Sequence, residues 1–582
     1  MRKTKGIYIM SITVIVCIIA VIAVLMIKNL YLTNRSVRIS YPFNNALFPN
    51  DFSAPTIIWK DKSAQTQSWK VTFSLKGNNQ FLVKVVDKNY FRPSKQEWEN
   101  MKKASKYENI EVVVQRNSPK ETSYFSSKGK IKLKISNDSV GAPVLYRQIP
   151  LPFGYAEAHI DEACYSTYNV SNYQNPRHEV LDKFPVCGNC HSSTADGKTI
   201  ALDFDAVTRD KGGYFVAKID TQTIFEKNNY MSWSKLIGKS TFGLFSKISP
   251  SGRYIITTVK DRVISQKFED MEKIAYSQLF VPVNGVLAIY DTQTKKLTEL
   301  PGANDMAYVQ TNAIWTPDEK NIIFARAKAL PYPKGKKRYT SILDDEHIIS
   351  QFIQEKFDMK FDLYTIPFNN GKGGQAKPIE SASNNGKSNF FPAISHDGKW
   401  LVYCQANNYM MLRPESCLYI HSMDGGKSKK LRCNLPQMNS WHSWSPNGKW
   451  IVFVSKGLSF YSDLFLTHID ENGNSSVPIL LEGGKRVGCA TNYPEFLNVN
   501  ENMKINMKYR YVNLPDIESA MNRGKLDTVR VLLKQYITQG FVGSPTEYRE
   551  IASFKLRLGE IEEFKKYNDM ADKLELTFNR GF

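Results

Sequence analysis

A short pattern recurs along the middle of this 582-residue chain and limits the folds that it can adopt. The pattern is a turn with a proline or a small residue, a glycine at the bend, a cation, and then a hydrophobic run. Its copies are STADGKTIALDF, ISPSGRYIITTV, WTPDEKNIIFAR, ISHDGKWLVYCQ and WSPNGKWIVFVS. Asp-Gly and Asn-Gly tolerate a positive φ, so each copy predicts a hairpin between two buried strands. Glu319 stands at the glycine position of one copy, which puts the turn geometry there in doubt.

Each copy is followed, after a variable gap, by a second hairpin-like segment. These segments are GYFVAKIDTQT, GVLAIYDTQTKKL, DLYTIPFNNGKGG, CLYIHSMDGGKSKKL and DLFLTHIDENG. Two hairpins make a four-stranded antiparallel unit, and such units stack radially because a lone sheet leaves both faces unburied. The repeats therefore predict a six-bladed β-propeller over residues 151–505. Five units are legible, and we expect the sixth to combine residues 493–496 with a strand that enters near residue 150.

The segments on either side of the repeats predict a mainly β chain with a helical end. Residues 38–150 contain short runs rich in β-branched and aromatic residues, such as WKVTFSLKG and IEVVVQ, which predict a β-sandwich of the immunoglobulin or fibronectin kind. One stretch, SKQEWENMKKAS, predicts a short helix within it. Residues 514–582 carry apolar residues at helical spacing and predict a small module of three or four helices.

The N-terminus predicts a membrane anchor. Arg2, Lys3 and Lys5 precede an uncharged apolar run over residues 7–27, and a helix needs roughly 20 apolar residues to cross a bilayer. A cleavable signal peptide is the alternative, although its apolar region usually spans only about 7–15 residues. The clustered cations predict that residues 1–6 lie in the cytoplasm. We therefore expect a single-pass inner-membrane protein with the bulk of the chain in the periplasm.

The net charge of +21 raises the question of a nucleic-acid partner. Lys and Arg are scattered along every segment, and KGKKR at residues 334–338 is the one basic run that stands out. An exported protein rarely meets nucleic acid. The partners that we expect are instead unidentified envelope proteins and, through the anchor, the inner membrane.

A C-x-x-C-H run formed by Cys187, Cys190 and His191 opens the first repeat. Two thiols at this spacing can add to the vinyl groups of one haem while the adjacent imidazole ligates its iron. A disulfide or redox-active pair of the two cysteines is the first alternative, and a metal site that also uses Cys164 or His178 is the second. A purely structural run is the third.

Alignment of the repeats on their bend suggests a second iron ligand. Six residues before the bend lie His191 in the first copy and His442 in the fifth. Inner strands of a propeller surround its central channel, so we expect both imidazoles on one rim. Met438 and His178 are competing ligands. The expected covalent haem c site comprises Cys187, Cys190, His191 and His442, with the two histidines as metal ligands.

Other chemistry-bearing residues give weaker signals. Eight cysteines in the whole chain are too few for a disulfide scaffold, although some of them could pair outside the membrane. The plausible couples are Cys404 with Cys417 and Cys433 with Cys489. Asp203 and Asp205 share one face of a predicted strand, and without an identifiable third ligand we expect them to be solvated or to line the channel.

The motif Ser-Pro-Asn-Gly-Lys-Trp at residues 445–450 resembles the propeller repeat of TolB-like proteins, and the resemblance covers about residues 185–505. The order of anchor, sandwich and VCGNCHSSTADGK is similar to exported TolB-like proteins of the Bacteroides group. Those proteins are often labelled cytochrome c-type or cytochrome c biogenesis proteins because of the same C-x-x-C-H run, and that label implies a haem role. TolB-like propellers are binding platforms rather than one enzyme class, so the resemblance implies a binding or assembly component of the envelope.

Two alternative functions stay open. The first is an envelope enzyme, either a thiol oxidoreductase that uses Cys187 and Cys190 or a carbohydrate- or peptide-directed activity at the propeller mouth. A thiol enzyme usually has its low-pKa cysteine at the start of a helix, whereas this run leads into a β-hairpin. The second alternative is a pure protein-interaction scaffold. The sequence contains no G-x-S-x-G elbow, which argues against a serine hydrolase of the propeller-capped kind, and we expect no catalytic residues.

Overall fold

The computed structural model describes most of the chain, in two compact units. The described residues are 37–61, 68–75, 79–105, 108–117, 128–159, 162–181, 188–204, 212–267, 278–331, 341–343, 345–411, 413–509, 514–539 and 545–579. The first unit ends at Ser139 and also includes Val477–Ile479, and the second unit contains the remaining residues from Val140 onward. The structure is mainly β, as the sequence predicts.

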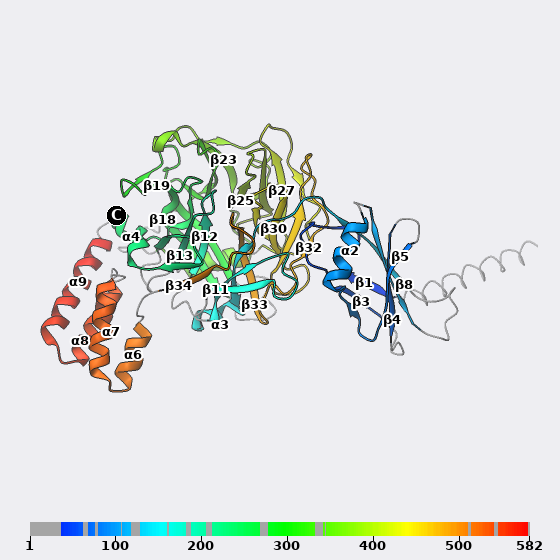
Figure 1. Ribbon diagram of the computed structural model, residues 1–582. Coiled ribbons are helices and arrows are strands. Elements are labelled where there is room, and N and C mark those ends of the chain that lie inside the picture. Colours follow the sequence, from blue (N-terminus) through cyan, green and yellow to red (C-terminus); the bar gives the residue numbers. More distant parts are fainter. Residues whose placement is uncertain are drawn as a thin grey trace, which may run out of the picture. The chain divides into compact units, whose positions relative to one another are not determined.

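The described residues of the first unit form two sheets and one helix (Figure 1). The smaller sheet consists of β1 (Arg38–Tyr41), β3 (Ile57–Lys60) and β6 (Tyr90–Phe91). The larger sheet consists, in spatial order, of β2 (Ala46–Phe48), β8 (Lys128–Ile135), β7 (Ile110–Arg116), β4 (Trp69–Leu75) and β5 (Asn79–Val86). Helix α2 (Lys95–Ser105) confirms the short helix predicted within this segment.

An apolar core and a buried ion pair hold the two sheets of the first unit together. Strand β8 alternates exposed and buried side chains along its length, which is typical of a sheet with one packed face. The rings of Trp59 and Trp69 lie 5.9 Å apart and connect the smaller sheet to the larger one. Beside them, the Asp61 carboxylate accepts hydrogen bonds from Trp69 Nε1 at 3.0 Å and from two nitrogens of Arg116 at 2.5 and 2.9 Å.

In the described part of the chain, six groups of four strands form the body of the second unit, apart from Ile479 at the start of β32. The first group is β12 (Gly188–Ser193), β13 (Thr199–Phe204), β14 (Gly213–Lys218) and β16 (Tyr230–Ser232). The second is β17 (Leu244–Ile248), β18 (Tyr254–Lys267), β19 (Gln278–Asp291) and β20 (Lys296–Glu299), and the third is β21 (Tyr308–Trp315), β22 (Asn321–Lys328), β23 (Asp362–Pro367) and β24 (Lys377–Pro378). A single parallel pairing of Gly285 with Val309 links these two groups.

The fourth group is β25 (Ser388–Ile394), β26 (Trp400–Ala406), β27 (Cys417–Ser422) and β28 (Lys429–Lys430). The fifth is β29 (Asn439–Trp444), β30 (Trp450–Ser455), β31 (Asp463–His468) and β32 (Ile479–Leu480), and the sixth is β33 (Cys489–Phe496), β9 (Val144–Pro150), β10 (Cys164–Tyr168) and β11 (Arg177–Leu181). Shorter elements lie in the connections. Within the groups they are α3 (Phe153–Ala158), between β9 and β10, and β15 (Gln222–Phe225), between β14 and β16. Outside the groups they are α4 (Trp233–Ile237), before β17, and β34 (Asn506–Tyr509), after β33.

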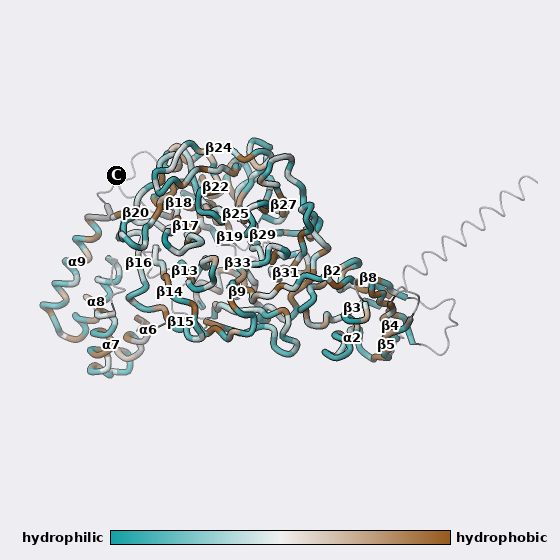
Figure 2. The backbone as a smooth tube through the Cα atoms, turned by 45° about the horizontal axis from the view of Figure 1, so that its top comes forward, coloured by the Kyte–Doolittle hydropathy of each residue, from teal (hydrophilic) through white to brown (hydrophobic). Residues whose placement is uncertain are grey.

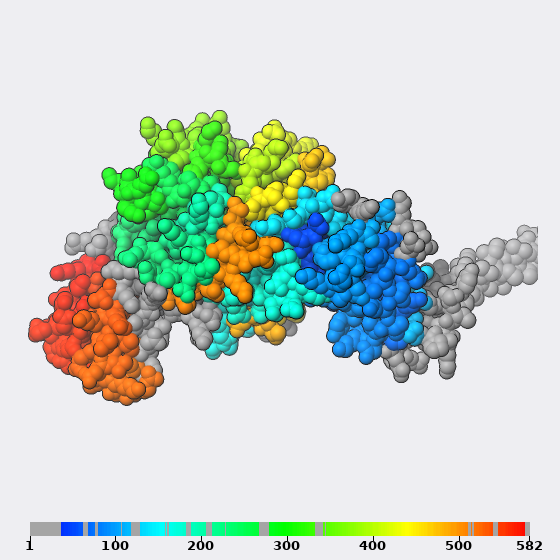
Figure 3. Space-filling model, viewed as in Figure 1, coloured from blue at the N-terminus to red at the C-terminus, as the bar shows by residue number. Residues whose placement is uncertain are grey.

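The first strands of the six groups contact one another in a ring, which is the arrangement of a β-propeller. The order around the ring is β12, β17, β21, β25, β29 and β33, and β33 contacts β12 again. Several of these strands can be followed around the centre in Figure 2. In the sixth group β33 pairs with β9, which confirms the prediction that residues 493–496 join a strand near residue 150. After β33, β34 pairs with β15 in parallel, and in Figure 3 an orange segment lies against cyan and green surface.

Strand β9 explains why the observed boundary between the two units differs from the predicted one. The predicted sandwich extends to residue 150, but the first unit ends at Ser139, and β9 belongs to the propeller. Every side chain of β9 is buried, as expected for a strand covered on both faces. The sequence prediction was wrong here because the strand that pairs with β9 lies far along the chain.

The repeated motif forms the turn after each of the first five inner strands. In the fifth copy Ser445 Oγ accepts a hydrogen bond from the backbone N–H of Trp450 at 2.9 Å, and Gly448 takes a φ of 68° at the bend. Glu319 takes a φ of 55° at the same position of the third copy, so the turn keeps its geometry without glycine. Its carboxylate also accepts a hydrogen bond from the Ser251 hydroxyl at 3.0 Å, which ties two neighbouring turns together.

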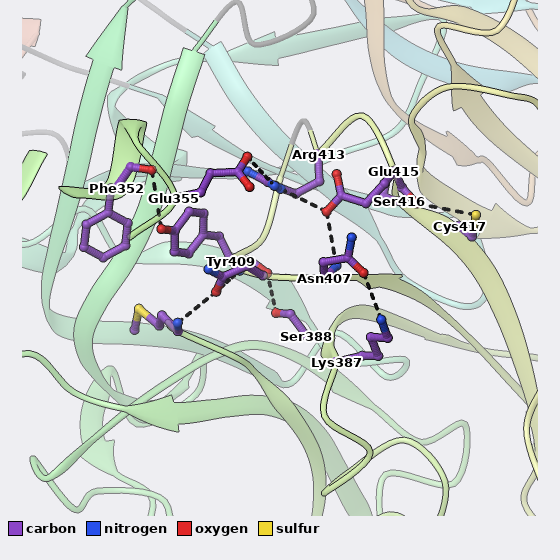
Figure 4. Close-up of polar contacts among 12 residues, drawn as sticks. Phe352, Glu355, Lys387, Ser388, Asn407, Tyr409, Arg413, Glu415, Ser416 and Cys417 are labelled. Carbon is purple, nitrogen blue, oxygen red and sulfur yellow. Dashed lines mark hydrogen bonds and ion pairs between the residues drawn. The ribbon is translucent and has the colours of Figure 1, made fainter. Parts of the chain in front are cut away.

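An insertion between β22 and β23 carries α5 (Glu346–Ile353) and is fixed to the fourth group (Figure 4). Arg413, in the connection after β26, donates a hydrogen bond to Glu355 at 2.9 Å. The hydroxyl of Tyr409, in the same connection, donates to the carbonyl oxygen of Phe357 at 2.7 Å. These contacts position the insertion at the end of the propeller opposite to the repeated turns.

The C-terminal residues form helices α6 (Leu514–Asn522), α7 (Leu526–Gln539), α8 (Pro545–Arg557) and α9 (Ile561–Asn579). They confirm the small helical module predicted from residue 514. Gly524 and Gly559 take φ values of 68° and 77° directly after α6 and α8, where a left-handed residue commonly ends a helix. The buried core of the module includes Ile517, Val529, Leu533, Ile551 and Phe554.

The predicted membrane anchor at residues 7–27 lies outside the described residues. Within the part of the chain that the structure describes, no helix is long and apolar enough to cross a membrane. The anchor and its orientation therefore stay predictions.

Candidate functional site

A cavity of about 390 Å³ lies inside the ring of inner strands, toward the repeated turns. All six inner strands contribute to its wall. The residues at its outer end are mostly small or apolar and include Ala195, Pro250, Pro317, Pro446 and Asn498. A volume of this size is within the usual range for small-molecule pockets.

In five of the inner strands, a residue that lines this cavity has a strained backbone conformation. Pairing of each of these strands with its neighbour shifts register at a bulge. At the bulge a residue other than glycine takes a positive φ. These residues are Phe245 (53°), Asn312 (60°), Phe391 (50°), Trp441 (36°) and Tyr493 (51°), and all five line the cavity. Such strain costs on the order of 1–3 kcal/mol per residue and persists only where the surroundings impose it.

Three of these side chains form an aromatic floor, which we define as Phe245, Phe391 and Trp441. The rings of Phe245 and Phe391 lie 5.6 Å apart, and those of Phe391 and Trp441 lie 6.3 Å apart. All three are at most 8% exposed, so the floor presents apolar ring surface to the cavity and little to bulk water. Stacked and edge-on contacts of this kind are the usual way in which proteins hold planar apolar groups.

A lysine and a glutamate supply the charges of the cavity wall. Lys247 Nζ, on β17, lies 3.4 Å from Glu495 Oε1 on β33, and it donates to the carbonyl oxygen of His191 at 3.3 Å. The same ammonium lies 5.0 Å from the centre of the Tyr493 ring. Burial raises the pKa of Glu495, and the neighbouring Lys247 opposes that rise. The pair therefore reaches across β12 and links the second group of strands to the sixth.

The structure places His191 on β12, but its ring is packed between strands of the sixth group. The side chain is fully buried, and its ring meets those of Tyr165 and Tyr493 edge-on at 5.8 and 5.6 Å. Neither ring nitrogen has a hydrogen bond of normal length, and Nε2 lies 3.9 Å from Glu495 Oε2. Burial and the nearby charge of Lys247 together lower the pKa of His191 to about 3, against an opposing effect of the Leu145 backbone. His191 is therefore a neutral ring enclosed by protein.

His442 occupies the equivalent place on β29 and also turns toward the preceding group of strands. Its Nε2 lies 3.1 Å from the carbonyl oxygen of Val402, and its Nδ1 lies 3.8 Å from Cys404 Sγ, both on β26. Burial lowers the pKa of His442 to about 4. Each of the two histidines thus contacts a different neighbouring group, and no contact joins their rings in the described structure.

These contacts bear on the predicted haem site. Cys187 lies outside the described residues, whereas Cys190 is adjacent to His191 on β12. Nε2 of His191 lies 3.9 Å from the Glu495 carboxylate, and two tyrosine rings meet the imidazole edge-on. Because Cys187 is not described, the haem c site stays a prediction. No group of three His, Cys, Asp or Glu side chains in the described ranges is placed to hold a metal ion.

Cys190 is a free thiol in surroundings that disfavour the thiolate. Burial and the nearby Asp203 raise its pKa to about 12, although Lys247 and Tyr493 oppose the rise. Reactive cysteines usually show the opposite shift. The environment of Cys190 therefore counts against the thiol oxidoreductase alternative.

The other residues singled out from the sequence lie apart from the cavity. His178 is exposed on β11 and lies 3.2 Å from Asn506 Oδ1, while Cys164 Sγ is 3.7 Å from Arg486 Nη1. Met438 is buried just before β29. Asp203 is buried on β13, and Asp205 lies outside the described residues.

The suggested disulfide couples are wrong, since Cys404, Cys417, Cys433 and Cys489 are all free thiols. The register of β26 and β27 explains the first case. Cys404 lies opposite Leu418, whereas Cys417 lies opposite Gln405. Successive residues of a strand point to opposite faces of the sheet, so the two sulfurs are on different sides.

Of the four predicted site residues, His442 lines the cavity, whereas the aromatic and charged residues of its wall were missed by sequence reasoning. The aromatic floor lies one position before the aligned histidine position, so the same alignment contains Phe245, Phe391 and Trp441 in a single column. That column of large aromatic residues is the signal that could have found the site. Lys247 and Glu495 do not recur at an aligned position of the repeats, so the sequence alone does not mark them as site residues.

The fold and this site define a β-propeller with a central, largely apolar cavity. No protein-family model and no curated protein matches the sequence. Solved structures with some likeness include TolB from Acinetobacter baumannii, with 15% identity, a TM-score of 0.38 and coverage of 67% of this chain and 79% of that chain. Putative TolB from Agrobacterium tumefaciens shows 11% identity, a TM-score of 0.32 and coverage of 58% and 88%. A periplasmic gluconolactonase from Pseudomonas aeruginosa shows 9% identity and a TM-score of 0.32, with coverage of 59% of this chain and 84% of that chain. The propeller assignment itself rests on the six strand groups and their ring of inner strands.

Proposed function

We propose that this chain is an exported β-propeller binding protein that holds a ligand, or a segment of a partner, in its central cavity. The observation that carries the proposal is the set of five strained residues that line one cavity from five different strands. Strain that recurs at the same place in successive repeats indicates that the side chains are needed there. An apolar floor with few polar groups is the usual construction of a binding pocket.

The chemistry of the wall favours binding over catalysis. Ser192 and Ser443, which could act as nucleophiles, each accept a hydrogen bond from a backbone N–H, of Ile248 at 3.1 Å and of Phe496 at 3.2 Å. His442 is held by a backbone carbonyl and stays neutral. A nucleophile needs a base within hydrogen-bond reach, and no such pair lines the described part of the cavity. A carbohydrate- or peptide-directed enzyme is therefore the weaker alternative.

The location of the protein follows from the N-terminal sequence. We propose that residues 7–27 anchor the chain in the inner membrane and that the propeller works in the periplasm, as expected for a relative of the exported TolB-like proteins of the Bacteroides group. The partners would then be other components of the envelope. A pure scaffold is the alternative, and it requires no ligand in the cavity.

Occupation of the cavity can be tested with 2-naphthamide, a neutral planar probe. Titration calorimetry on the full chain, with empty detergent micelles as the blank, is expected to show saturable binding. Replacing Trp441 by Ala removes part of the aromatic floor and is expected to weaken binding at least tenfold, about the effect of losing one ring contact. Phe460→Ala is the control, because Phe460 is 66% exposed and does not line the cavity.

A second variant guards against misfolding of Trp441→Ala. Ala195 is exposed in a turn at the mouth, so Ala195→Trp should fold normally and obstruct entry. Equal probe affinity in the wild type, Ala195→Trp and Trp441→Ala would contradict the proposal and favour the scaffold.

The haem c alternative has its own test. We propose that Cys190 and His191 are structural residues of β12, because the thiol is disfavoured as a thiolate and the ring is enclosed. Expression with a haem-attachment system is then expected to give a protein with no Soret band and an unmodified intact mass. A Soret band with the added mass of one haem, lost in Cys187→Ala, would overturn this assignment and restore the cytochrome c-type interpretation.

A further inference from the structure

We infer that the ligand of the central cavity is an organic anion with an apolar, ring-bearing body, and that Lys247 binds its charged group. This inference rests on the proposed function and specifies its ligand. It combines two features of one wall, the aromatic floor and a single ammonium near it.

Lys247 is the one permanent cation among the described residues that line the cavity, and Glu495 is the one carboxylate. An ammonium has three donor hydrogens. Lys247 uses two contacts within the protein, to His191 at 3.3 Å and to Glu495 at 3.4 Å. Both are longer than the roughly 2.7–2.9 Å of a strong charge-assisted hydrogen bond. The ammonium therefore retains capacity for an acceptor that arrives from the cavity.

Glu495 does not saturate Lys247. Its Oε2 is turned toward His191 and lies beyond hydrogen-bond distance of any donor, so only Oε1 faces the ammonium. The side chain of Lys247 is 21% exposed, which leaves it accessible at the wall. A ligand carboxylate or sulfonate can approach the third donor without displacing the existing contacts.

The rest of the wall selects an apolar body. The floor consists of aromatic rings, and the mouth is formed largely by prolines such as Pro250, Pro317 and Pro446. A hydrophilic anion such as inorganic phosphate would lose hydration there without compensation. The net charge of +21 also favours anions over cations during approach to the protein.

The test compares 2-naphthoate with 2-naphthamide, which share one ring system and differ in charge. Titration calorimetry on the full chain is expected to show that the wild type binds the carboxylate about tenfold more tightly than the amide. Lys247→Met is expected to remove this preference, because methionine keeps the stem and loses the charge. Lys198→Met is the matched control, since Lys198 is an exposed turn lysine outside the cavity wall.

A second variant, Glu495→Gln, is expected to change the affinity for 2-naphthoate in the opposite direction. Glu495→Gln removes the internal counterion of Lys247, so 2-naphthoate is expected to bind about three- to tenfold more tightly while 2-naphthamide is unaffected. A folding defect cannot tighten binding, so the opposite responses of Lys247→Met and Glu495→Gln separate charge recognition from damage.

Two results would overturn the inference. In the first, the two probes bind with equal affinity, Lys247→Met changes neither affinity, and Trp441→Ala weakens both. The cavity then binds apolar ligands without distinguishing their charge, so the inference fails while the proposed function holds. If neither probe binds to the wild type, the inference and the proposed function both fail.

Discussion

Asp61→Ala is expected to destabilise the first unit by about 3–5 kcal/mol, the usual consequence of leaving one partner of a buried ion pair without its counterion. The side chains of Asp61 and Arg116 are 3% and 7% exposed, so water cannot replace the lost carboxylate. Trp69 Nε1 would lose its acceptor as well. The variant therefore removes the carboxylate that connects β4 and β7 to the end of β3.

Hydrogen exchange measured by mass spectrometry on the full chain resolves this effect from the propeller. Peptides from β3, β4 and β7 are expected to exchange faster in Asp61→Ala, and those from β12 to β32 to be unchanged. Asp87→Ala is the matched control, because Asp87 is an exposed acid of the same unit. Equal protection of β4 in the two variants would show that the ion pair contributes nothing to stability.

The repeat pattern was sufficient to predict the propeller because the information is local. A glycine at the bend of four of the five copies indicates a backbone position that needs a positive φ, and the strands on either side follow from the hydrophobic runs. Gly448 and Glu319 both take that conformation. The closing pair β9 and β33 could be predicted as well, since a ring of strand groups leaves no edge unpaired.

The boundary at residue 150 and the direction of the histidine rings could not be predicted in the same way. Alignment placed His191 and His442 correctly on inner strands, but a β-bulge in each strand decides which way a side chain turns. Because of the bulge, the His191 ring packs against the sixth group and does not line the cavity, whereas on β29 both His442 and the preceding Trp441 line it. A repeat alignment gives the position of a residue along a strand and leaves the twist at a bulge undetermined.

The other site residues depend on contacts between distant strands. Lys247 and Glu495 come from β17 and β33, and they meet only because β12 lies between these strands in the ring. Neither residue belongs to a repeated column. Their pairing is a property of the closed ring, so it became visible only when the strands were placed in three dimensions.

Acidification is expected to destabilise the propeller through the two buried histidines. Burial lowers the pKa of His191 to about 3 and of His442 to about 4, whereas an imidazole in an unfolded chain titrates near 6.5. Below pH 6.5 the unfolded chain therefore binds protons that the folded chain cannot accept. The stability that depends on the neutral rings is complete above pH 6.5 and is lost as the pH falls toward the folded pKa values.

One pKa unit corresponds to about 1.4 kcal/mol, so His191 alone is expected to lower the free energy of unfolding by about 3 kcal/mol between pH 7 and pH 4. The urea midpoint of the propeller transition, followed by near-ultraviolet circular dichroism at pH 7, 5.5 and 4, measures this slope.

His191→Leu removes the titrating ring from an apolar setting between Tyr165 and Tyr493 and is expected to flatten the slope. His178→Leu is the control, because His178 is exposed and should leave the slope as in the wild type. Since each variant is compared with itself across pH, a general loss of stability in His191→Leu does not affect the result. An unchanged slope in His191→Leu would mean that the pKa of the ring in the folded protein is close to its value in the unfolded chain, and it would contradict this prediction.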